Sequence, residues 1–342
     1  MTDTGRRYFL RTACSLTLLC GAQRLATAFP ADNAPVQGSP HATNTFPIID
    51  AHIHLYDPRR RGGVPWPERT DIVLYRPALP SRYRRIAAPL GVVGAVAVEC
   101  SPLEADNDWL LHVAAADTMV VGVIGNLDPA HNDFARKLER LQRHALFRGI
   151  RYGNLWGRKL GEGLKSSTFV ENLKLLSERG LLMETANPDP RLITNVVELS
   201  DRVPGLRIII DHLPHAVPPM EHAARRKYED ELAELSKRPQ VLVKGSELFR
   251  RVGDDVVKDL AFYTDWLDQI WGWFGEDRML FGSDWPNSDH MASYADTLDI
   301  VSRYVTPKGP KAAEKFFCKN SIAAYRWNAR NPAQAKLLRA FG

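Results

Sequence analysis

Two histidines separated by one residue are the first side chains in this 342-residue sequence that could carry out chemistry. His52 and His54 follow a short apolar run and flank Ile53. Alternate side chains of a β-strand point to the same face, so the two imidazoles would converge where that strand ends. Converging imidazoles can hold a divalent metal or polarise a carbonyl group, although an isolated pair of this kind is as often structural.

Three other apolar runs also end in polar residues. The runs IIIDH, LFGSD and VAVE end at His212, Asp284 and Glu99. Polar groups at the ends of buried strands are costly to desolvate unless they serve a site, and parallel strands bring these ends to one face. We therefore expect His52, His54, His212 and Asp284 to share one site.

The residue types indicate a division of roles within that site. Asp284 is a carboxylate that could take a proton from an attacking water, and His212 would polarise the substrate carbonyl or bind a metal. A divalent ion on His52, His54 and Asp284 would lower the pKa of the water and stabilise the developing oxyanion. Three histidines and an aspartate in one site favour attack by an activated water on a carbonyl carbon.

Eight apolar runs in the sequence could be the strands that position these residues. They are nearly continuously apolar, as in parallel strands covered on both faces, and span 46–54, 92–100, 119–127, 147–152, 181–185, 206–212, 240–245 and 278–283. Segments with helical period lie between and after them, at 106–117, 132–145, 168–179, 191–202, 221–237, 256–274 and 291–304. This pattern predicts an α/β fold, a (β/α)8 TIM barrel, with a C-terminal helical extension over 311–327 and 332–341.

The first connection, over 56–91, is long and rich in Pro and Arg. A structureless loop of this length in a compact domain is usually functional. Because it leaves the carboxyl end of the first strand, we expect it to fold over the mouth of the barrel. The basic run Arg59 to Arg61 within it is expected to face solvent.

Residues 1–28 have the order of a twin-arginine signal peptide. Arg6 and Arg7 precede a short apolar stretch and the small-residue site Ala26-Thr27-Ala28. The alternative is an amphipathic helix of the folded domain. Residues 29–45 are typical of a flexible leader, and 46–342 form the barrel domain. The sequence thus predicts recognition by the twin-arginine export machinery, a periplasmic or secreted location, and no membrane attachment after signal removal.

The motifs and their order resemble the amidohydrolase superfamily, and specifically its lactonase-like branch of metal-dependent TIM-barrel hydrolases. The similar segments lie within 48–327 and are IIDAHIHLYDP, VAVECSP, RGIRYGNLW, IIIDHLPH, VLVKGSELF, MLFGSDWP and FCKNSIAAYRW. The resemblance implies a TIM-barrel hydrolase whose reacting centre is formed by His52, His54, His212 and Asp284.

The resemblance also bears on the metal. Binuclear members carry a carboxylated Lys or a Glu at the end of the fourth strand, where this chain has the segment 148–152, RGIRY. We therefore expect at most one divalent ion, zinc, with Glu99 and Glu184 as candidates either for further ligands or for hydrogen-bond partners. Lactonases that resemble this branch include metal-independent ones, so catalysis without a metal stays open.

Basic residues on the strands favour a small-molecule substrate that is anionic or polyhydroxylated. Arg148, Arg151 and Tyr152 belong to the fourth predicted strand and Lys244 to the seventh, and we expect all four to contact the substrate. Without residues 1–28 the chain has 41 basic and 39 acidic residues, a net charge of +2. This balance is not that of a nucleic-acid-binding protein.

Together these features predict a hydrolase of a sugar-acid lactone or carboxylated lactone, or of a related ester or amide. One alternative is a metal-dependent non-oxidative decarboxylase of an aromatic or unsaturated acid, since such enzymes resemble the same superfamily. Glu184 stands at the end of the fifth strand where a histidine would be expected for that activity. The other alternative is a non-catalytic exported binding protein, against which the intact set of three histidines and an aspartate argues.

Overall fold

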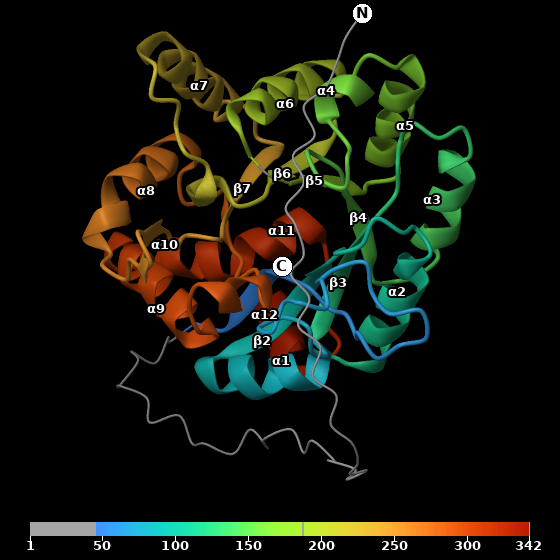
Figure 1. The fold of residues 1–342 in the computed structure, drawn as a ribbon, viewed down its shortest axis with the longest axis horizontal. Coiled ribbons are helices and arrows are strands. Elements are labelled where there is room, and N and C mark those ends of the chain that lie inside the picture. Colours follow the sequence, from blue (N-terminus) through green and yellow to red (C-terminus); the bar gives the residue numbers. More distant parts are fainter. Residues whose placement is uncertain (1–45, 187, 342) are drawn as a thin grey trace, which may run out of the picture. The chain divides into compact units, whose positions relative to one another are not determined.

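Eight parallel strands form one sheet in which neighbours follow chain order (Figure 1). The computed structural model describes residues 46–186 and 188–341, so the predicted signal peptide and leader lie outside it. The strands are β1 (Ile48–Ile53), β2 (Val92–Val98), β3 (Val120–Gly125), β4 (Phe147–Arg151), β5 (Leu182–Thr185), β6 (Arg207–Ile210), β7 (Val241–Gly245) and β10 (Met279–Phe281). Each predicted strand is present within a few residues of its expected bounds, and the predicted TIM barrel is confirmed.

The barrel closes between its first and last strands through residues at and just past the strand ends. The peptide N–H of Asp284 donates to the carbonyl oxygen of His52 (2.9 Å), and that of His54 donates to the carbonyl oxygen of Trp285 (2.7 Å). Ile53 and Trp285 form a parallel bridge. Closure of the sheet therefore places both histidines directly beside Asp284.

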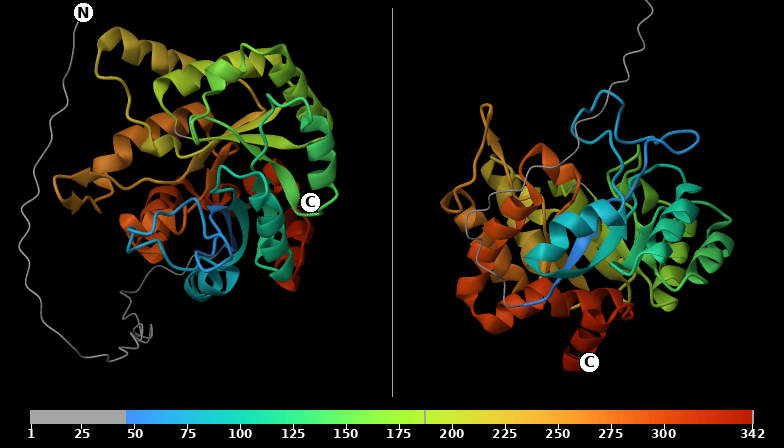
Figure 2. Two further views of the ribbon diagram at one scale, coloured as in Figure 1. Left: turned by 45° about the vertical axis from the view of Figure 1, so that its right-hand side comes forward. Right: turned by 90° about the horizontal axis from the view of Figure 1, so that it is seen from below.

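Helices surround the sheet (Figures 1 and 2). In α6, the buried residues Leu192, Val196 and Leu199 recur at helical spacing, and the Asp189 side chain caps the first turn by accepting from the N–H of Leu192. The helices are α1 (Pro80–Ala87), α2 (Asp106–Ala116), α3 (Phe134–Gln142), α4 (Leu160–Gly163), α5 (Ser167–Glu178), α6 (Pro190–Arg202), α7 (His222–Leu235), α8 (Ala261–Phe274), α9 (Tyr294–Val305), α10 (Pro310–Glu314), α11 (Asn320–Tyr325) and α12 (Pro332–Phe341). Within the described ranges, no helix is long and apolar enough to cross a membrane.

The second half of the first connection, over 56–91, contains a helix where the sequence predicted a structureless loop. Residues predicted as structureless include α1, which buries Tyr83 and Ala87 one turn apart. Three arginines in this eight-residue helix obscure that spacing in the sequence. In the first half, the ring of Trp66 packs edge-on against His54, with centroids 5.7 Å apart. The loop therefore does reach the site residues at the mouth, as expected.

A short hairpin, β8 (Arg251–Val252) with β9 (Asp255–Val256), follows β7.

The C-terminal extension closes the amino end of the barrel, opposite the end where the polar residues lie. Gln334 of α12 donates to the carbonyl oxygens of Val93 and Thr118 (both 2.8 Å), at the starts of β2 and β3. The apolar side of α12 joins the cluster that fills the barrel interior. Only the carboxyl end is left to hold a polar site.

Candidate active site

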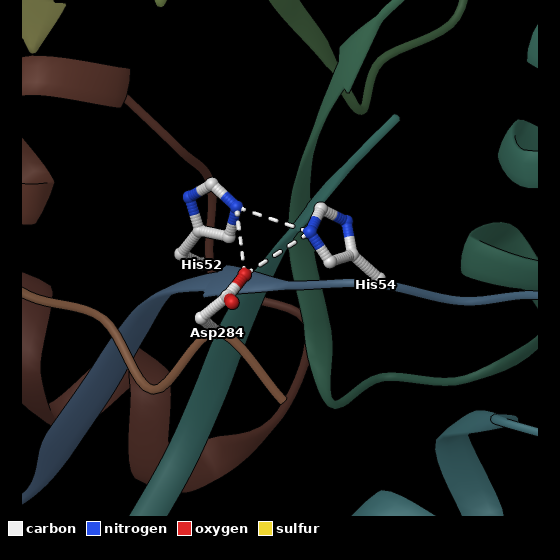
Figure 3. Close-up of side chains that lie close together, drawn as sticks. All are labelled: His52, His54 and Asp284. Atoms are coloured by element: carbon white, nitrogen blue, oxygen red, sulfur yellow. Dashed lines mark hydrogen bonds and ion pairs between the residues drawn. The ribbon is translucent and has the colours of Figure 1, made fainter. Parts of the chain in front are cut away.

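Three side chains, from the end of β1, the residue after it and the segment after β10, converge at the carboxyl end of the barrel (Figure 3). Nε2 of His54 lies 3.1 Å from Oδ1 of Asp284, and Nε2 of His52 lies 3.4 Å from the same oxygen. The two Nε2 atoms are 3.3 Å apart. All three side chains are buried. The structure therefore brings together the three residues predicted as metal ligands.

An irregularity in the pairing of β1 turns His52 into the barrel. Strict alternation would place Asp50 on the same face as His52 and His54. Instead, the register between β1 and β2 shifts after Asp50. The Asp50 carboxylate accepts hydrogen bonds from the hydroxyls of Tyr83 (2.8 Å) and Tyr294 (3.0 Å) on the outer helices. Such bulges commonly re-aim side chains beside active sites, and this one separates a structural acid from the two histidines.

Acceptor atoms in this triad face one another. Nδ1 of His54 donates to the carbonyl oxygen of Val98 (3.0 Å), so its Nε2 carries a lone pair. Oδ1 of Asp284 is buried and accepts no hydrogen bond. Two acceptors 3.1 Å apart repel each other unless a cation or a proton lies between them. Ligands at about 2.0–2.1 Å from a tetrahedral zinc ion lie about 3.3–3.4 Å apart, close to the spacing found here, so the triad fits one divalent ion.

A buried ion-pair network lies against the other nitrogen of His52. Nζ of Lys244 is 3.0 Å from Nδ1 of His52, 2.7 Å from Oε2 of Glu184 and 3.0 Å from Oδ1 of Asp211. The second oxygen of Glu184 accepts a hydrogen bond from the hydroxyl of Tyr325 (2.6 Å). Asp211 is also 3.7 Å from Nδ1 of His52. Lys244 and Asp211 thus decide which ring nitrogen of His52 carries the proton. The ammonium of Lys244, a donor, favours the proton on Nε2, whereas the carboxylate of Asp211, an acceptor, favours it on Nδ1.

Three residues that follow strands share a left-handed backbone conformation. The φ angles of His212, Glu247 and Asp284 are 57°, 50° and 59°. Such angles are uncommon outside glycine, and strained backbone concentrates at functional sites. The turns bring one potential ligand atom from each residue within 4.8 Å of the others. The ring of His212 lies 4.6 Å from that of His52 between centroids, so His212 joins the predicted cluster.

Hydrogen bonds orient His212 and Asp284 within the cluster. Nδ1 of His212 lies 2.8 Å from the hydroxyl oxygen of Ser246. When that hydroxyl donates, the proton of the neutral ring is on Nε2. The Asn287 side-chain amide donates to Oδ2 of Asp284 (2.7 Å) and to Oε1 of Glu247 (2.8 Å). Asn287 therefore occupies one oxygen of Asp284 and leaves Oδ1 available.

Burial shifts the pKa values of the acids and of the imidazoles in opposite directions. It raises the pKa of Asp284 to about 6, and, together with the charge of Asp284, the pKa of Glu247 to about 8. It lowers the pKa of His54 to about 4 and the pKa values of His52 and His212 well below their usual range. At neutral pH the site therefore holds neutral imidazoles, an ionised Asp284 and a largely protonated Glu247.

Two of the four residues predicted to contact the substrate lie next to the cluster, but both have internal partners. Nε of Arg151 donates to Oε1 of Glu99 (2.8 Å) and its Nη2 to the carbonyl oxygen of Glu99 (2.6 Å). Lys244 is held by Glu184 and Asp211. Neither Glu99 nor Glu184 is in a candidate ligand group within the described residues. Of the two roles considered for these acids, hydrogen-bond partner is the one that the geometry favours.

Arg148 and Tyr152, the other two residues predicted to contact the substrate, lie away from the cluster. Tyr152 packs against Phe169 of α5, with ring centroids 5.0 Å apart, and so faces the outer helices. Arg148 lines a separate pocket beside Leu146 at the start of β4. Alternation along β4 explains the difference, because residues 148 and 152 lie an odd number of positions from Arg151. The structure does not bring either residue to the cluster.

Four residues of the site were not assigned a role from the sequence. Asp211 directly precedes His212, Ser246 and Glu247 follow β7, and Asn287 lies three residues after Asp284. Their position after apolar strands is the signal that could have found them. Sequence spacing alone does not show that Asp211 faces Lys244 or that Asn287 joins two carboxylates.

The chain is similar to known proteins in both sequence and fold. The family model described as amidohydrolase matches residues 49–327. An L-fucono-1,5-lactonase of Burkholderia ambifaria is 29% identical over 290 residues, which cover 81% of this chain and 95% of that protein. An amidohydrolase structure from Burkholderia multivorans with bound Zn has a TM-score of 0.71 and 21% identity, covering 82% of this chain and 100% of that one. A putative 2-pyrone-4,6-dicarboxylic acid hydrolase from Pseudomonas putida has a TM-score of 0.63 and 21% identity, covering 82% and 98%.

Proposed function

The chain belongs to the amidohydrolase family, whose model matches most of its length, and from this premise we propose that it hydrolyses the lactone of a sugar acid. One observation carries the proposal. The ionised Asp284 has a buried oxygen without a hydrogen bond, held within 3.4 Å of two neutral imidazoles at the mouth of a barrel. The similarity to an L-fucono-1,5-lactonase supports a lactone as the substrate.

Asp284 is the base in the proposed reaction. It takes a proton from water as the water oxygen attacks the lactone carbonyl carbon. The carbon–oxygen bond of the ring then breaks, and Asp284 returns the proton to the leaving alkoxide, which gives the open hydroxy acid. The N–H at Nε2 of His212 donates to the carbonyl oxygen as negative charge develops on it. Ser246 and Asn287 hold these two groups in orientation.

One divalent ion, zinc, is the proposed cofactor. His52, His54 and Asp284 would hold it, as the spacing of their ligand atoms allows. When bound, it would lower the pKa of a water and polarise the substrate carbonyl. The zinc in the Burkholderia multivorans structure supports this identity. Elemental analysis of the purified protein, followed by chelation and re-addition of single metals, tests it: activity that survives complete metal removal would contradict the proposal.

The proposed substrate is neutral and polyhydroxylated. The two cations next to the cluster, Arg151 and Lys244, are already paired with Glu99, Glu184 and Asp211. A substrate carboxylate would have to displace one of these buried acids, which would then be left unpaired. Of the two substrate classes that the sequence predicted, these pairings favour a polyhydroxylated substrate over an anionic one.

We also retain the proposal that residues 1–28 direct twin-arginine export to the periplasm or beyond. The paired Arg6 and Arg7 and the site at Ala28 support it. Cell fractionation of the wild type and of a variant with both arginines changed to lysine tests it. Equal distribution of the two proteins between fractions would contradict export by this route.

A pH-indicator assay with a panel of sugar-acid lactones, simple esters and aromatic acids tests the reaction class. We expect acid release from 1,5-lactones and no CO2 release from the aromatic acids. CO2 release without lactone opening would establish the decarboxylase alternative. Absence of turnover on every compound, with or without added zinc, would favour the binding-protein alternative.

A further inference from the structure

A pocket of about 260 Å³ lies at the amino end of the barrel, opposite the end that holds the reacting centre. It is bounded by the second half of α2, the loop before β4 and the segment after α11, with the lining Leu111, Ala115, His144, Ala145, Leu146, Arg148, Asn328 and Arg330. None of these residues belongs to the apolar cluster inside the barrel, so the pocket lies outside the barrel interior. A water molecule in the liquid occupies about 30 Å³, and this pocket is therefore large enough for a small organic molecule.

The guanidinium of Arg148 lines this pocket without a partner in the protein. Its Nε and Nη2 are covered by protein atoms and form no hydrogen bond within the described ranges 46–186 and 188–341. Burial lowers the pKa of Arg148, and no neighbouring carboxylate counters this shift. Arginine nevertheless stays protonated. A positive charge is therefore partly removed from water with nothing in the described protein to compensate it, which is costly.

The position of this charge is fixed by the strand next to β4. Gly122 of β3 makes room for the stem of Arg148, since a Cβ at residue 122 would lie 3.1 Å from Cγ of Arg148. With Nε and Nη2 covered, Nη1 is the nitrogen that a ligand in the pocket can reach. The charge is spread over the whole planar group, so a ligand at Nη1 is attracted by all of it. Because Arg148 is already held in place, a ligand loses little free energy in ordering it.

A second cation lines the pocket, and no acid does. Nη1 of Arg330 donates to three backbone carbonyl oxygens at the end of α2 and the start of β3, and Nη2 donates to a fourth, at 2.6–2.8 Å. These acceptors are uncharged, so they leave the positive charge of Arg330 in place. The carboxylate of Asp117, which follows α2, is paired with Arg84. The lining thus carries two guanidinium charges without a carboxylate.

Much of the remaining lining is apolar. Leu111 and Ala115 of α2 face the pocket together with Ala145 and Leu146 of the loop before β4. An inorganic anion would compensate the cations but leave this hydrocarbon surface uncovered. A neutral apolar molecule would cover the surface but leave Arg148 without a partner. A molecule that combines a carboxylate with a small apolar body matches both parts of the lining.

We propose that this pocket is a binding site for a small organic carboxylate, whose carboxylate group lies at Arg148 and whose apolar part packs on Leu111 and Leu146. The site is separate from the reacting centre, and the proposal does not depend on the proposed lactonase function. The bound carboxylate compensates the charge of Arg148, so binding stabilises the folded chain.

Titration calorimetry of the purified protein with three probes tests the class of ligand. Benzoate carries a carboxylate on an apolar ring, benzamide has the same shape without the charge, and sulfate has charge without an apolar body. We expect benzoate to bind at least about 10-fold more tightly than either other probe, as one charge-assisted hydrogen bond can provide. Equal binding of benzamide or sulfate, or no binding of benzoate, would overturn the proposal.

Arg148→Met tests the charge and should weaken benzoate binding at least about 10-fold. The matched control is Arg207→Met. Arg207 is another half-buried arginine at the start of a strand, with Nε buried and unpartnered and Nη2 donating to the carbonyl oxygen of Gly180 (2.6 Å), but it does not line the pocket. This control should bind benzoate as the wild type does. Equal weakening in both variants would contradict a site at Arg148.

Two neighbouring alanines of α2 test the position of the ligand. Both Ala115 and Ala116 are exposed, and only Ala115 lines the pocket. Ala115→Trp fills the pocket and should abolish benzoate binding, whereas Ala116→Trp should keep it. Asp284→Asn should keep it too. Binding that is lost in Asp284→Asn but kept in Arg148→Met and Ala115→Trp would place benzoate at the reacting centre and overturn the proposal.

Thermal unfolding gives an independent readout. Without benzoate, Arg148→Met should melt a few degrees above the wild type, because it removes an uncompensated charge and keeps an unbranched side chain beside Gly122. Benzoate should raise the melting temperature of the wild type and leave that of Arg148→Met unchanged. A melting temperature of Arg148→Met below that of the wild type would mean that the guanidinium already has a stabilising partner, which would contradict the proposal.

Discussion

The two ends of the barrel interior are lined by opposite kinds of side chain. Near the amino end, apolar residues of the strands, including Ile49, Val121 and Leu182, pack with Trp327 and Leu337 of the C-terminal extension. At the carboxyl end, polar and charged side chains are buried just as completely, namely Glu184, Asp211, Lys244, His52 and Asp284. Both ends exclude water, but only at the amino end does this exclusion bury apolar surface and so stabilise the fold.

The difference separates an end that stabilises the fold from an end that would carry the proposed reaction. Burying an ion pair recovers at best the cost of removing its charges from water, so such pairs are weak evidence for stability. The carboxyl end also holds strained backbone at His212, Glu247 and Asp284. These costs persist only because the remaining structure offsets them. Changes at the two ends should therefore separate activity from stability.

The largest effect should come from Asp284→Asn. Loss of the base should lower kcat/KM by at least about 10³-fold, since general-base catalysis contributes about 10²–10⁴-fold. In chelator-treated protein the melting temperature at pH 7.5 should rise by a few degrees. Burial raises the pKa of Asp284 to about 6, above its usual value, so the ionised wild-type side chain destabilises the fold above that pH. Activity near the wild-type level would remove Asp284 from its proposed role.

At the opposite end, Leu182→Ala should give the reverse pattern. The side chain is fully buried among apolar neighbours at the start of β5. Its truncation should lower the free energy of unfolding by about 2–5 kcal/mol, as for other buried leucines. Denaturant unfolding measures this, and kcat/KM per folded molecule should change less than 3-fold. A variant that kept its stability but lost activity would contradict the division between the two ends.

Tyr325 joins the two ends, so its hydroxyl offers a sharper test. The ring belongs to the apolar cluster, while the hydroxyl donates to Glu184 in the charged network. Tyr325→Phe leaves that carboxylate oxygen without this donor and should cost about 1–3 kcal/mol of stability. We expect kcat/KM to fall no more than 3-fold, measured beside the unfolding curve. A fall of 100-fold or more would mean that the network acts directly in the reaction.

The last test is the dependence of stability on pH. Because burial raises the pKa of Asp284 to about 6 in the metal-free site, the free energy of unfolding of chelator-treated protein should fall, relative to Asp284→Asn, as the pH rises from about 4 to about 6. Denaturant unfolding of both proteins from pH 4.5 to 8 measures this difference. A difference that stays constant between pH 4.5 and 7 would argue against a raised pKa of Asp284.

Sequence reasoning succeeded where local pattern is sufficient. The apolar runs gave the eight strands, and the polar residues that follow them gave His52, His54, His212 and Asp284. It failed where the direction of a side chain decided the outcome. Arg148 and Arg151 lie on one strand three positions apart, and only Arg151 reaches the cluster. Helix α1 was not predicted because three arginines stand among its buried residues, Pro80, Tyr83 and Ala87.

Hydrophobic period and the polar residues at strand ends thus determined the barrel and the four residues that meet at its carboxyl end, because parallel strands end on one face. The family followed from the resemblance of the motifs. Only the tertiary structure decided that Asp50 turns outward, that Lys244 and Arg151 are already paired, and that Arg60, expected to face solvent, pairs with Asp106. Each of these depends on a partner far away in the chain: Lys244 lies 192 residues from His52, and Arg60 lies 46 from Asp106. Pairing over such separations is set by packing in three dimensions, which local sequence does not encode.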